Sequence, residues 1–169
     1  MTRTLAQLQG VTVRRGMHLV LKDKNFEVQQ EDIHLLVGTN GSGKSTLIES
    51  LAGLTTFEQG TLQHDGQLVA DGEGRRKRST LPVAIALQSN GVMGSESISE
   101  HLEYATSMYG RSIDQAPFLE AFSLLHRKHD LVATLSAGQR RKVAILAAIL
   151  PAFASASPTM ILLDEPDAG

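Results

Sequence analysis

The segment from Gly38 to Ser45, GTNGSGKS, restricts the fold of this chain more than any other stretch of its sequence. It follows an apolar run, DIHLLVG, and precedes a segment whose apolar residues repeat with a helical period. Glycine at positions 41 and 43 allows backbone conformations and close approaches that a Cβ would block, so that successive N–H groups can converge on phosphate oxygens. We therefore expect a strand, a phosphate-binding loop and a helix in succession, which indicates an α/β fold.

The residue types in this loop predict a nucleotide phosphate site. Lys44 can reach the β- and γ-phosphates, and the Ser45 hydroxyl can ligate Mg²⁺. The start of the following helix adds a partial positive charge. An ordinary glycine turn before a helix is the alternative, but the strand-to-helix context favours the nucleotide site. The predicted binding residues are Gly38, Thr39, Asn40, Gly41, Ser42, Gly43, Lys44, Ser45 and Thr46.

The end of the sequence, MILLDEPDAG, places two acids directly after an apolar run. Beside a phosphate loop, a buried strand that ends in Asp164 is the expected holder of the Mg²⁺ shell. The adjacent Glu165 is well placed to orient or deprotonate an attacking water. An acidic helix start after a core strand is the alternative interpretation, and the phosphate loop favours the functional one.

Composition limits the classes of protein to consider. A chain of 169 residues with 41% hydrophobic content can bury a core as one domain, with room for an inserted lobe. Its formal net charge of -2 gives no general electrostatic reason to expect nucleic acid or an anionic membrane as the main ligand. The absence of cysteine excludes disulfides and thiolate metal sites and fits a reducing compartment. With no apolar stretch of signal or membrane-spanning length, we expect a soluble cytoplasmic protein.

Strand and helix patterns alternate along the chain. Four short strand patterns fill residues 4–37, and the most apolar of them, at 32–38, is predicted to be a buried strand. A helix is expected from Lys44, and the dipeptide Asp65-Gly66 predicts a hairpin. The later predictions are a strand over 82–88, helices over 97–131 interrupted near Gly110 and Pro117, a helix over 135–150 ended by Pro151, and a strand over 160–164. This alternation argues for a largely parallel sheet covered on both faces.

The segment LSAGQ has two interpretations. Ser136 and Gln139 have the spacing of a capping box, which is a common start of a helix. In order along the chain, however, the phosphate loop, a strand-end Gln88, LSAGQ and MILLDEP resemble the ATP-binding domain of the ABC ATPase family, in which a similar LSGGQ follows a helical lobe. The resemblance covers essentially the whole chain and implies ATP and Mg²⁺ as ligands.

The resemblance also implies an architecture. It is that of a P-loop NTPase (RecA-like), with a mostly parallel sheet, an N-terminal antiparallel β part and an inserted helical lobe. The nucleotide-binding core would consist of residues 1–88 and 132–169, and the lobe would comprise residues 89–131. The function implied is that of the motor subunit of an ABC transporter, with transmembrane subunits as partners. Such a subunit works as a dimer, here expected to be a homodimer, and lies at the inner face of the cell membrane.

Several site roles come from the resemblance alone. Gln88 resembles the glutamine that senses Mg²⁺ and the attacking water. Ser136, Gly138 and Gln139 would face the γ-phosphate that a second protomer holds. Arg15 stands where the family usually has an aromatic residue that stacks on adenine, and its planar guanidinium offers a substitute. Among such ATPases, LSAGQRRKVAILAAIL is most similar to the short subunit of the heme exporter of cytochrome c maturation.

The sequence departs from the family pattern in three places. Ala137 replaces a glycine of the signature, and PAFASASPT lengthens the step to the last strand. All six histidines precede Asp164, so none matches the family's switch histidine, and we expect this chain to lack the C-terminal part needed for full turnover. The alternatives are a soluble ABC ATPase acting on ribosomes or DNA, a P-loop kinase and a module that binds nucleotide without hydrolysis.

Two further features of the sequence are expected to have no binding role. The basic run RRKR at 75–78 is expected to be a solvated loop. His126 and His129 are expected to be exposed helix residues rather than a metal site.

Overall fold

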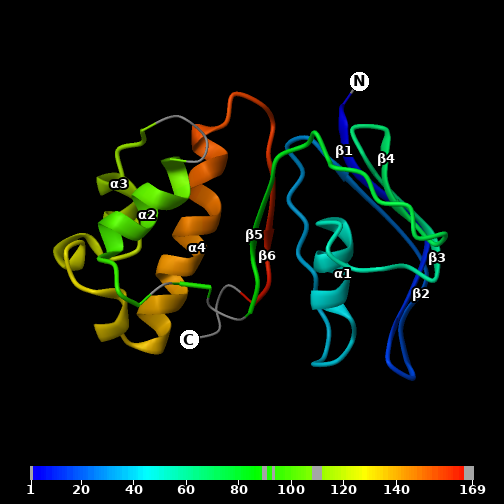
Figure 1. Ribbon diagram of the computed structural model, residues 1–169, viewed down its shortest axis with the longest axis horizontal. Coiled ribbons are helices and arrows are strands. Elements are labelled where there is room, and N and C mark those ends of the chain that lie inside the picture. Colours follow the sequence, from blue (N-terminus) through cyan, green and yellow to red (C-terminus); the bar gives the residue numbers. More distant parts are fainter. Residues whose placement is uncertain (1, 89–90, 93, 108–111, 166–169) are drawn as a thin grey trace. The chain divides into compact units, whose positions relative to one another are not determined.

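The computed structural model describes residues 2–88, 91–92, 94–107 and 112–165, and it divides into two compact units. Unit 1 comprises Met1–Val83, and unit 2 comprises Ala84–Gly169 (Figure 1). The elements of unit 1 are β1 (Thr4–Arg15), β2 (His18–Gln29), α1 (Lys44–Leu51), β3 (Gln59–His64) and β4 (Gln67–Asp71). Those that follow are β5 (Val83–Ala86), α2 (Ile98–Ser107), α3 (Ala116–Ala121), η1 (Leu125–Arg127), η2 (Val132–Thr134), α4 (Ala137–Ala154) and β6 (Met160–Leu163).

Unit 1 is built on a four-stranded sheet with the order β2-β1-β3-β4, in which every neighbouring pair is antiparallel. This confirms the antiparallel N-terminal β part. The short strands expected on either side of Asn25 are instead one long strand, β2. The Asn25 side chain accepts a hydrogen bond of 2.9 Å from the N–H of Gly10, where β1 bulges, so a residue that often ends strands here stabilises one.

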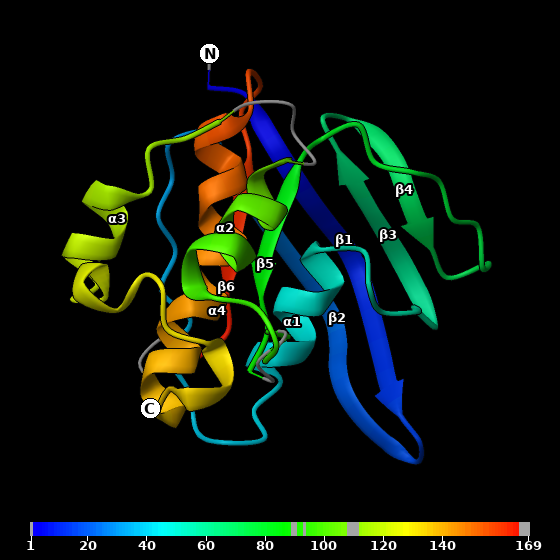
Figure 2. The same ribbon diagram turned by 60° about the vertical axis from the view of Figure 1, so that its left-hand side comes forward.

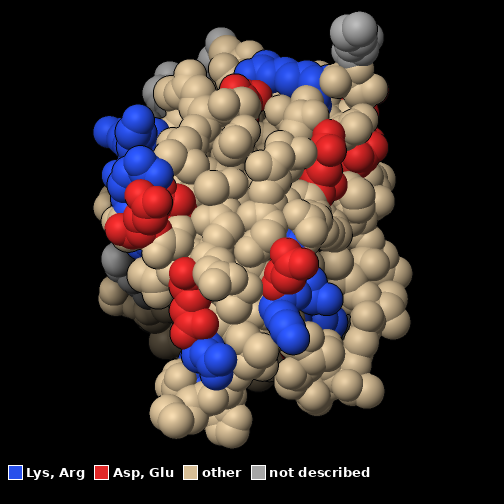
Figure 3. Space-filling view, turned by 90° about the vertical axis from the view of Figure 1, so that its right-hand side faces the viewer, with Lys and Arg blue, Asp and Glu red and all other residues tan. Residues whose placement is uncertain are grey.

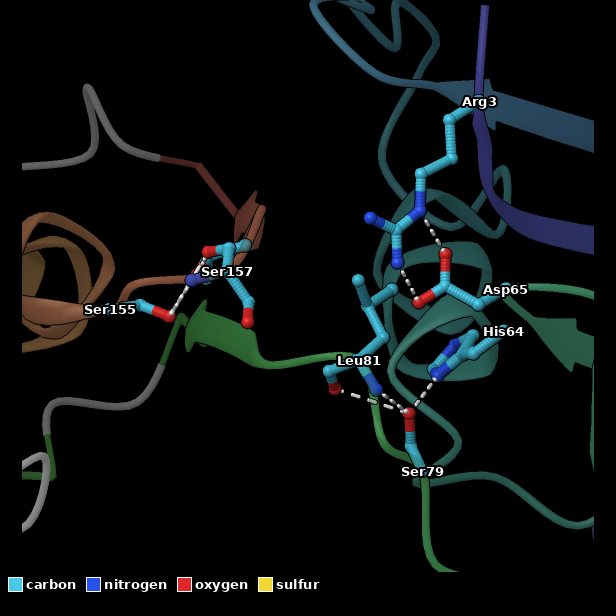
Figure 4. A network of polar contacts seen from close by, with 8 residues as sticks. Arg3, His64, Asp65, Ser79, Leu81, Ser155 and Ser157 are labelled. Carbon is cyan, nitrogen blue, oxygen red and sulfur yellow. Dashed lines mark hydrogen bonds and ion pairs between the residues drawn. The ribbon is translucent and has the colours of Figure 1, made fainter.

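The hairpin between β3 and β4 is confirmed. Its two turn residues, Asp65 and Gly66, both have positive φ, at 48° and 73°, which is the conformation that a type I′ turn requires. The carboxylate of Asp65 also accepts two hydrogen bonds, of 2.7 and 2.8 Å, from the guanidinium of Arg3 (Figure 4). This turn is therefore fixed both by its own backbone and by the start of β1.

The buried strand predicted for residues 32–38 is wrong. This segment is not part of a sheet, and Ile33, Leu35 and Val37 are 98%, 85% and 86% exposed. An apolar run becomes a buried strand only when another strand pairs with it and a helix covers it. The described residues offer it no pairing strand, so its alternating side chains remain in solvent.

His64, at the end of β3, is a buried titratable group in unit 1. Its Nε2 lies 2.8 Å from the carbonyl oxygen of Leu51 and its Nδ1 lies 2.7 Å from the hydroxyl of Ser79 (Figure 4). Because a carbonyl only accepts, Nε2 carries a proton and donates it to Leu51. Burial lowers the pKa of His64 below its ordinary value of 6.5, with a smaller opposing effect of the Leu51 carbonyl.

Acid is therefore expected to destabilise unit 1 through His64. The unfolded chain takes up a proton near pH 6.5 and the folded chain does so only at lower pH, so the free energy of unfolding should fall as pH drops below 6.5. One such group contributes a slope of at most about 1.4 kcal/mol per pH unit. Urea denaturation between pH 7.5 and 5 should show this slope in the wild type and a smaller one in His64→Gln. Equal slopes in the two proteins would contradict the prediction.

Unit 2 combines a short sheet with a cluster of helices. β5 pairs with β6, and α2 packs against α4 (Figure 2). The expected strands over 82–88 and 160–164 are confirmed in position. The hydrophobic core of unit 2 combines residues of the predicted lobe with residues between 132 and 150. Its buried members are Ile98, Leu102, Leu119, Leu124, Val132, Leu135, Val143, Leu146 and Leu150. The division into core 1–88 with 132–169 and lobe 89–131 stays a prediction.

Pro151 does not act in unit 2 as the sequence suggested. Pro151 was expected to end its helix, but α4 continues to Ala154. Proline removes one helical hydrogen bond. Here Pro151 is buried, and Phe153 makes an edge-to-face contact with Phe118 at 5.0 Å between ring centroids, so packing offsets part of that loss. Pro117 lies in the first turn of α3, where proline is tolerated, and Gly110 falls outside the described residues. No helix among the described residues has the length and apolar character needed to cross a bilayer.

Candidate functional site

The phosphate loop has the backbone geometry that its glycines predicted. Gly41 and Gly43 have φ of 82° and 94°, a left-handed conformation that side chains disfavour. A Cβ on Gly43 would also lie 3.1 Å from Leu21 Cδ2, and one on Gly38 would lie 2.7 Å from Ser42 Oγ. Side chains at positions 38 and 43 would therefore crowd the loop and its neighbours.

The start of α1 and Lys44 complete this loop. No side chain caps the N-terminus of α1, so its first N–H groups are available to an anion. Lys44 Nζ donates hydrogen bonds of 2.9 and 3.1 Å to the carbonyl oxygens of Gly38 and Thr39, which folds its ammonium back over the loop. Free N–H groups and one ammonium form a donor set that fits phosphate oxygens.

Arg15, the candidate for adenine stacking, lies at the end of β1. Its guanidinium forms an ion pair with Glu49 of α1, and the Thr55 hydroxyl donates to the same carboxylate at 3.3 Å. The Arg15 side chain remains 55% exposed, so its planar face is accessible. Stacking on adenine stays a prediction.

In unit 2, the ends of β5 and β6 bring two predicted catalytic residues together. Gln88 Nε2 donates a hydrogen bond of 2.8 Å to Glu165 Oε2, although the two are 77 residues apart in sequence. The N–H of Asp164 donates to the carbonyl oxygen of Ala86 at 2.9 Å, which fixes the register of the two strand ends. Asp164 is buried, at 3% exposure, and Glu165 has a left-handed φ of 47°.

Arg141 of α4 was missed by the sequence interpretation. It is 4% exposed and donates hydrogen bonds to the carbonyl oxygens of Leu87 and Asp164, and to that of Glu165 at 3.2 Å. The available signal was Ile145, one turn later in the same helix, because a buried Ile145 puts Arg141 on a buried face. The apolar stripe of Val143 and Leu146, which the sequence did show, packs on a different side.

The signature segment begins α4 as a capping box, as predicted. The Ser136 hydroxyl accepts from the N–H of Gln139 at 3.2 Å, and the Gln139 side chain accepts from the N–H of Ser136 at 2.9 Å. Arg127 also donates to the Gln139 side chain, at 2.8 Å. Ser136 itself is exposed, and Gly138 lies in the first turn of the helix. Their contact with a nucleotide on a second protomer stays a prediction.

Two arginines of the basic run at 75–78 bind groups within unit 1. Arg75 pairs with Asp71 and Glu73, and Arg76 donates to the carbonyl oxygens of Gly53 and Thr55. The hydrogen bond from Arg75 is the main reason that the pKa of Asp71 is lowered. On the face of the protein in Figure 3, basic and acidic groups lie beside one another. This loop is thus held by internal pairing of charges.

Two of the predicted metal ligands also suit the ion chemically. The Ser45 hydroxyl and the Asp164 carboxylate are oxygen donors of the kind that Mg²⁺ prefers, and the third candidate, Gln88, offers an amide oxygen. In the structure the Gln88 amide nitrogen binds Glu165, which leaves its oxygen free to take a ligand. Each of these groups thus offers an oxygen that a hard divalent cation accepts, and their binding to one ion stays a prediction.

Comparison with known proteins extends these findings. The ABC transporter family model matches residues 21–168. The chain is 35% identical over 160 residues to the cytochrome c biogenesis ATP-binding export protein CcmA of Nitrosococcus oceani, covering 95% of this chain and 70% of the relative. It is 30% identical over 171 residues to the Fe(3+) ions import ATP-binding protein FbpC of Streptomyces coelicolor, covering 98% of this chain and 47% of that relative.

A solved structure agrees with the sequence relatives. The structure, an ATP-binding subunit of an ABC transporter, has a TM-score of 0.75 and 29% identity, and the match covers 96% of this chain and 66% of that one. The chain thus spans about half to two thirds of the length of these proteins. The match confirms the α/β P-loop fold with its antiparallel N-terminal sheet. By motif, fold and sequence, the chain belongs to the ABC transporter ATP-binding family.

Proposed function

We propose that this chain is the ATP-binding motor subunit of an ABC transporter, which couples ATP binding and hydrolysis to transport by membrane subunits. The observation that carries the proposal is the phosphate loop, with two left-handed glycines, an uncapped helix start and the Lys44 ammonium folded over it. These are donors for the phosphates of a nucleotide. Family membership supports ATP as that nucleotide.

The proposed roles follow from the chemistry of each group. The loop N–H groups and Lys44 bind the phosphates, and Ser45 and Asp164 supply oxygen ligands to Mg²⁺. Bound Mg²⁺ neutralises charge that develops on the phosphates. Glu165 orients the attacking water and takes its proton, and Gln88 holds the Glu165 carboxylate through the hydrogen bond of 2.8 Å. Arg15 would stack on the adenine ring.

The direction of transport is a finer proposal. The similarity to two export proteins of cytochrome c biogenesis, from Nitrosococcus oceani and Roseobacter denitrificans, supports an export system for heme in cytochrome c maturation. The similarity to an iron importer and to a maltose importer of Escherichia coli supports only the general motor role. Co-purification of the membrane subunit with this chain, followed by its identification, decides between export and import.

We further propose that the chain works as a homodimer on the cytoplasmic face of a membrane. Relatives are named as ATP-binding parts of import and export systems, which supports membrane subunits as the partners. Exposure of Ser136 at the start of α4 supports a second copy of this chain as the other partner. Fractionation of cells with and without the membrane subunit would test the location.

Removal of the Lys44 ammonium is expected to weaken ATP binding. A charge-assisted hydrogen bond contributes roughly 1.5 to 3 kcal/mol, so Lys44→Ala should raise the dissociation constant of ATP-Mg²⁺ by about 10-fold to 150-fold. Calorimetric titration measures this directly, with Lys24→Ala, an exposed lysine of β2, as the matched control. Equal ATP affinity in the wild type and Lys44→Ala would contradict the proposed site.

A further inference from the structure

The guanidinium of Arg141 holds main-chain oxygens at the ends of both strands of unit 2. One of its terminal nitrogens donates to the carbonyl of Leu87, and the other donates to those of Asp164 and Glu165. These carbonyls directly precede or belong to the residues that carry the proposed chemistry. A planar fork with donors on separate nitrogens can span such acceptors, whereas a lysine ammonium cannot reach them all.

Stability alone does not explain an arginine at this position. The residue is 4% exposed, and its three acceptors are neutral carbonyls, which compensate a buried cation only in part. Its Nε is the one buried side-chain nitrogen or oxygen without a hydrogen-bond partner in the described part of the chain. An apolar side chain of similar length would avoid both costs, so the explanation lies in what the arginine holds.

The backbone at Glu165 requires support of this kind. A φ of 47° places this residue in the left-handed region, which non-glycine residues adopt at a cost and keep only when their surroundings fix them. Arg141 donates to the carbonyl of Glu165 and to the carbonyl of the residue before it, so it holds the main chain on both sides of the strained φ. In this conformation the Glu165 carboxylate accepts the hydrogen bond of Gln88 at 2.8 Å.

We propose that Arg141 is a positioning residue that sets the geometry of the Gln88–Glu165 pair. This inference rests on the proposed ATPase function, because the pair matters only if Glu165 acts on the attacking water. Arg141 works through the main chain, since it contacts Leu87 just before Gln88 and the carbonyls of Asp164 and Glu165. α4 begins at Ala137, four residues earlier, so a shift of this helix start would be transmitted through Arg141 to the carboxylate of Glu165.

The test compares two substitutions on the same helix in the full-length protein. Arg141→Met removes the donors at similar length, and Lys142→Met removes the next cation, whose Nζ donates to the carbonyl of Phe122 at 3.1 Å. We expect Arg141→Met to lower kcat of ATP hydrolysis about 10-fold to 100-fold, with the dissociation constant of ATP within about threefold of the wild type. Lys142→Met should retain the wild-type kcat.

A double-mutant cycle separates positioning from general damage. In a Gln88→Ala background the pair is already broken, so Arg141→Met should lower kcat by less than about threefold. A purely structural role would instead lower kcat by the same factor in both backgrounds, which would overturn the inference. Wild-type kcat in Arg141→Met would overturn it as well.

Two further outcomes are also decisive. If Arg141→Met does not unfold cooperatively, Arg141→Lys replaces it, because the charge is kept and the three-carbonyl span is lost. A kcat reduced at least about threefold in Arg141→Lys supports the inference, and a wild-type kcat overturns it. If the wild type and Lys142→Met both fail to turn over ATP, the proposed function fails and this inference fails with it. Turnover in the wild type with no effect at Arg141 rejects the inference alone.

Discussion

The Glu165→Gln variant is expected to bind ATP normally and to hydrolyse it about two to four orders of magnitude more slowly than the wild type. Glutamine keeps the size of the side chain and an oxygen that can accept the hydrogen bond from Gln88, which spans 2.8 Å in the wild type. What it loses is the negative charge that orients a water and the basicity that takes its proton. The loss should therefore fall on kcat, with the dissociation constant of ATP within about threefold.

The measurement is steady-state phosphate release by the full-length protein with saturating ATP, beside calorimetric titration for binding. Glu120→Gln in α3 is the matched control, because Glu120 is an exposed glutamate of unit 2 outside the proposed site. Its kcat should equal that of the wild type. If Glu165→Gln also turned over ATP at the wild-type rate, the general base would have to be another group.

Features that depend on a few neighbouring residues were predictable from the sequence. The β3–β4 hairpin follows from the dipeptide Asp65-Gly66, and both residues have the positive φ that the turn needs. The capping box at Ser136 likewise follows from its spacing to Gln139. The phosphate loop belongs to the same class, because glycine spacing and the following helix lie within one short segment. Each of these structures is determined by local backbone preference and a local hydrogen bond.

Features that depend on contacts between residues far apart in the sequence could not be predicted from local patterns. The apolar run at 32–38 has the composition of a buried strand, but burial requires a strand beside it, and the pattern of the run carries no information about that neighbour. Proline favours the end of a helix by its local chemistry, yet α4 continues past a buried Pro151 to Ala154, and Phe153 contacts Phe118. In both cases tertiary contacts decided the outcome.

The candidate site shows the same division. Gln88, Asp164 and Glu165 could be proposed one at a time from strand ends and motifs, but their sequence positions do not predict the hydrogen bond between Gln88 and Glu165. Arg141 was missed because its acceptors come from two strands that are far from it in sequence. An arginine in an amphipathic helix is ordinarily a solvated residue, and only the fold shows that this one is buried.

Ser136 provides the second large expected effect. It lies exposed at the start of α4, with its hydroxyl bound to the N–H of Gln139, so the helix start is capped and still faces outward. If a second protomer places its γ-phosphate against Ser136, an arginine side chain at position 136 would occupy the space of that phosphate. We expect Ser136→Arg to weaken ATP-dependent dimerisation of the Glu165→Gln protein by at least about 30-fold, equivalent to about 2 kcal/mol, the threshold for a dominant interface residue.

Two control variants separate this effect from damage to the helix. Ser136→Ala removes the cap and should cost about 1 kcal/mol of folding stability, which thermal unfolding measures without reference to a dimer. Ser157→Arg adds the same bulk and charge at an exposed position just beyond the other end of α4, and it should dimerise as the parent does. Sedimentation of each variant with ATP-Mg²⁺ under conditions without turnover gives the dimer affinity. If Ser136→Arg dimerises as tightly as Ser157→Arg, the helix start is only a cap, and the nucleotide contact between protomers must involve other residues.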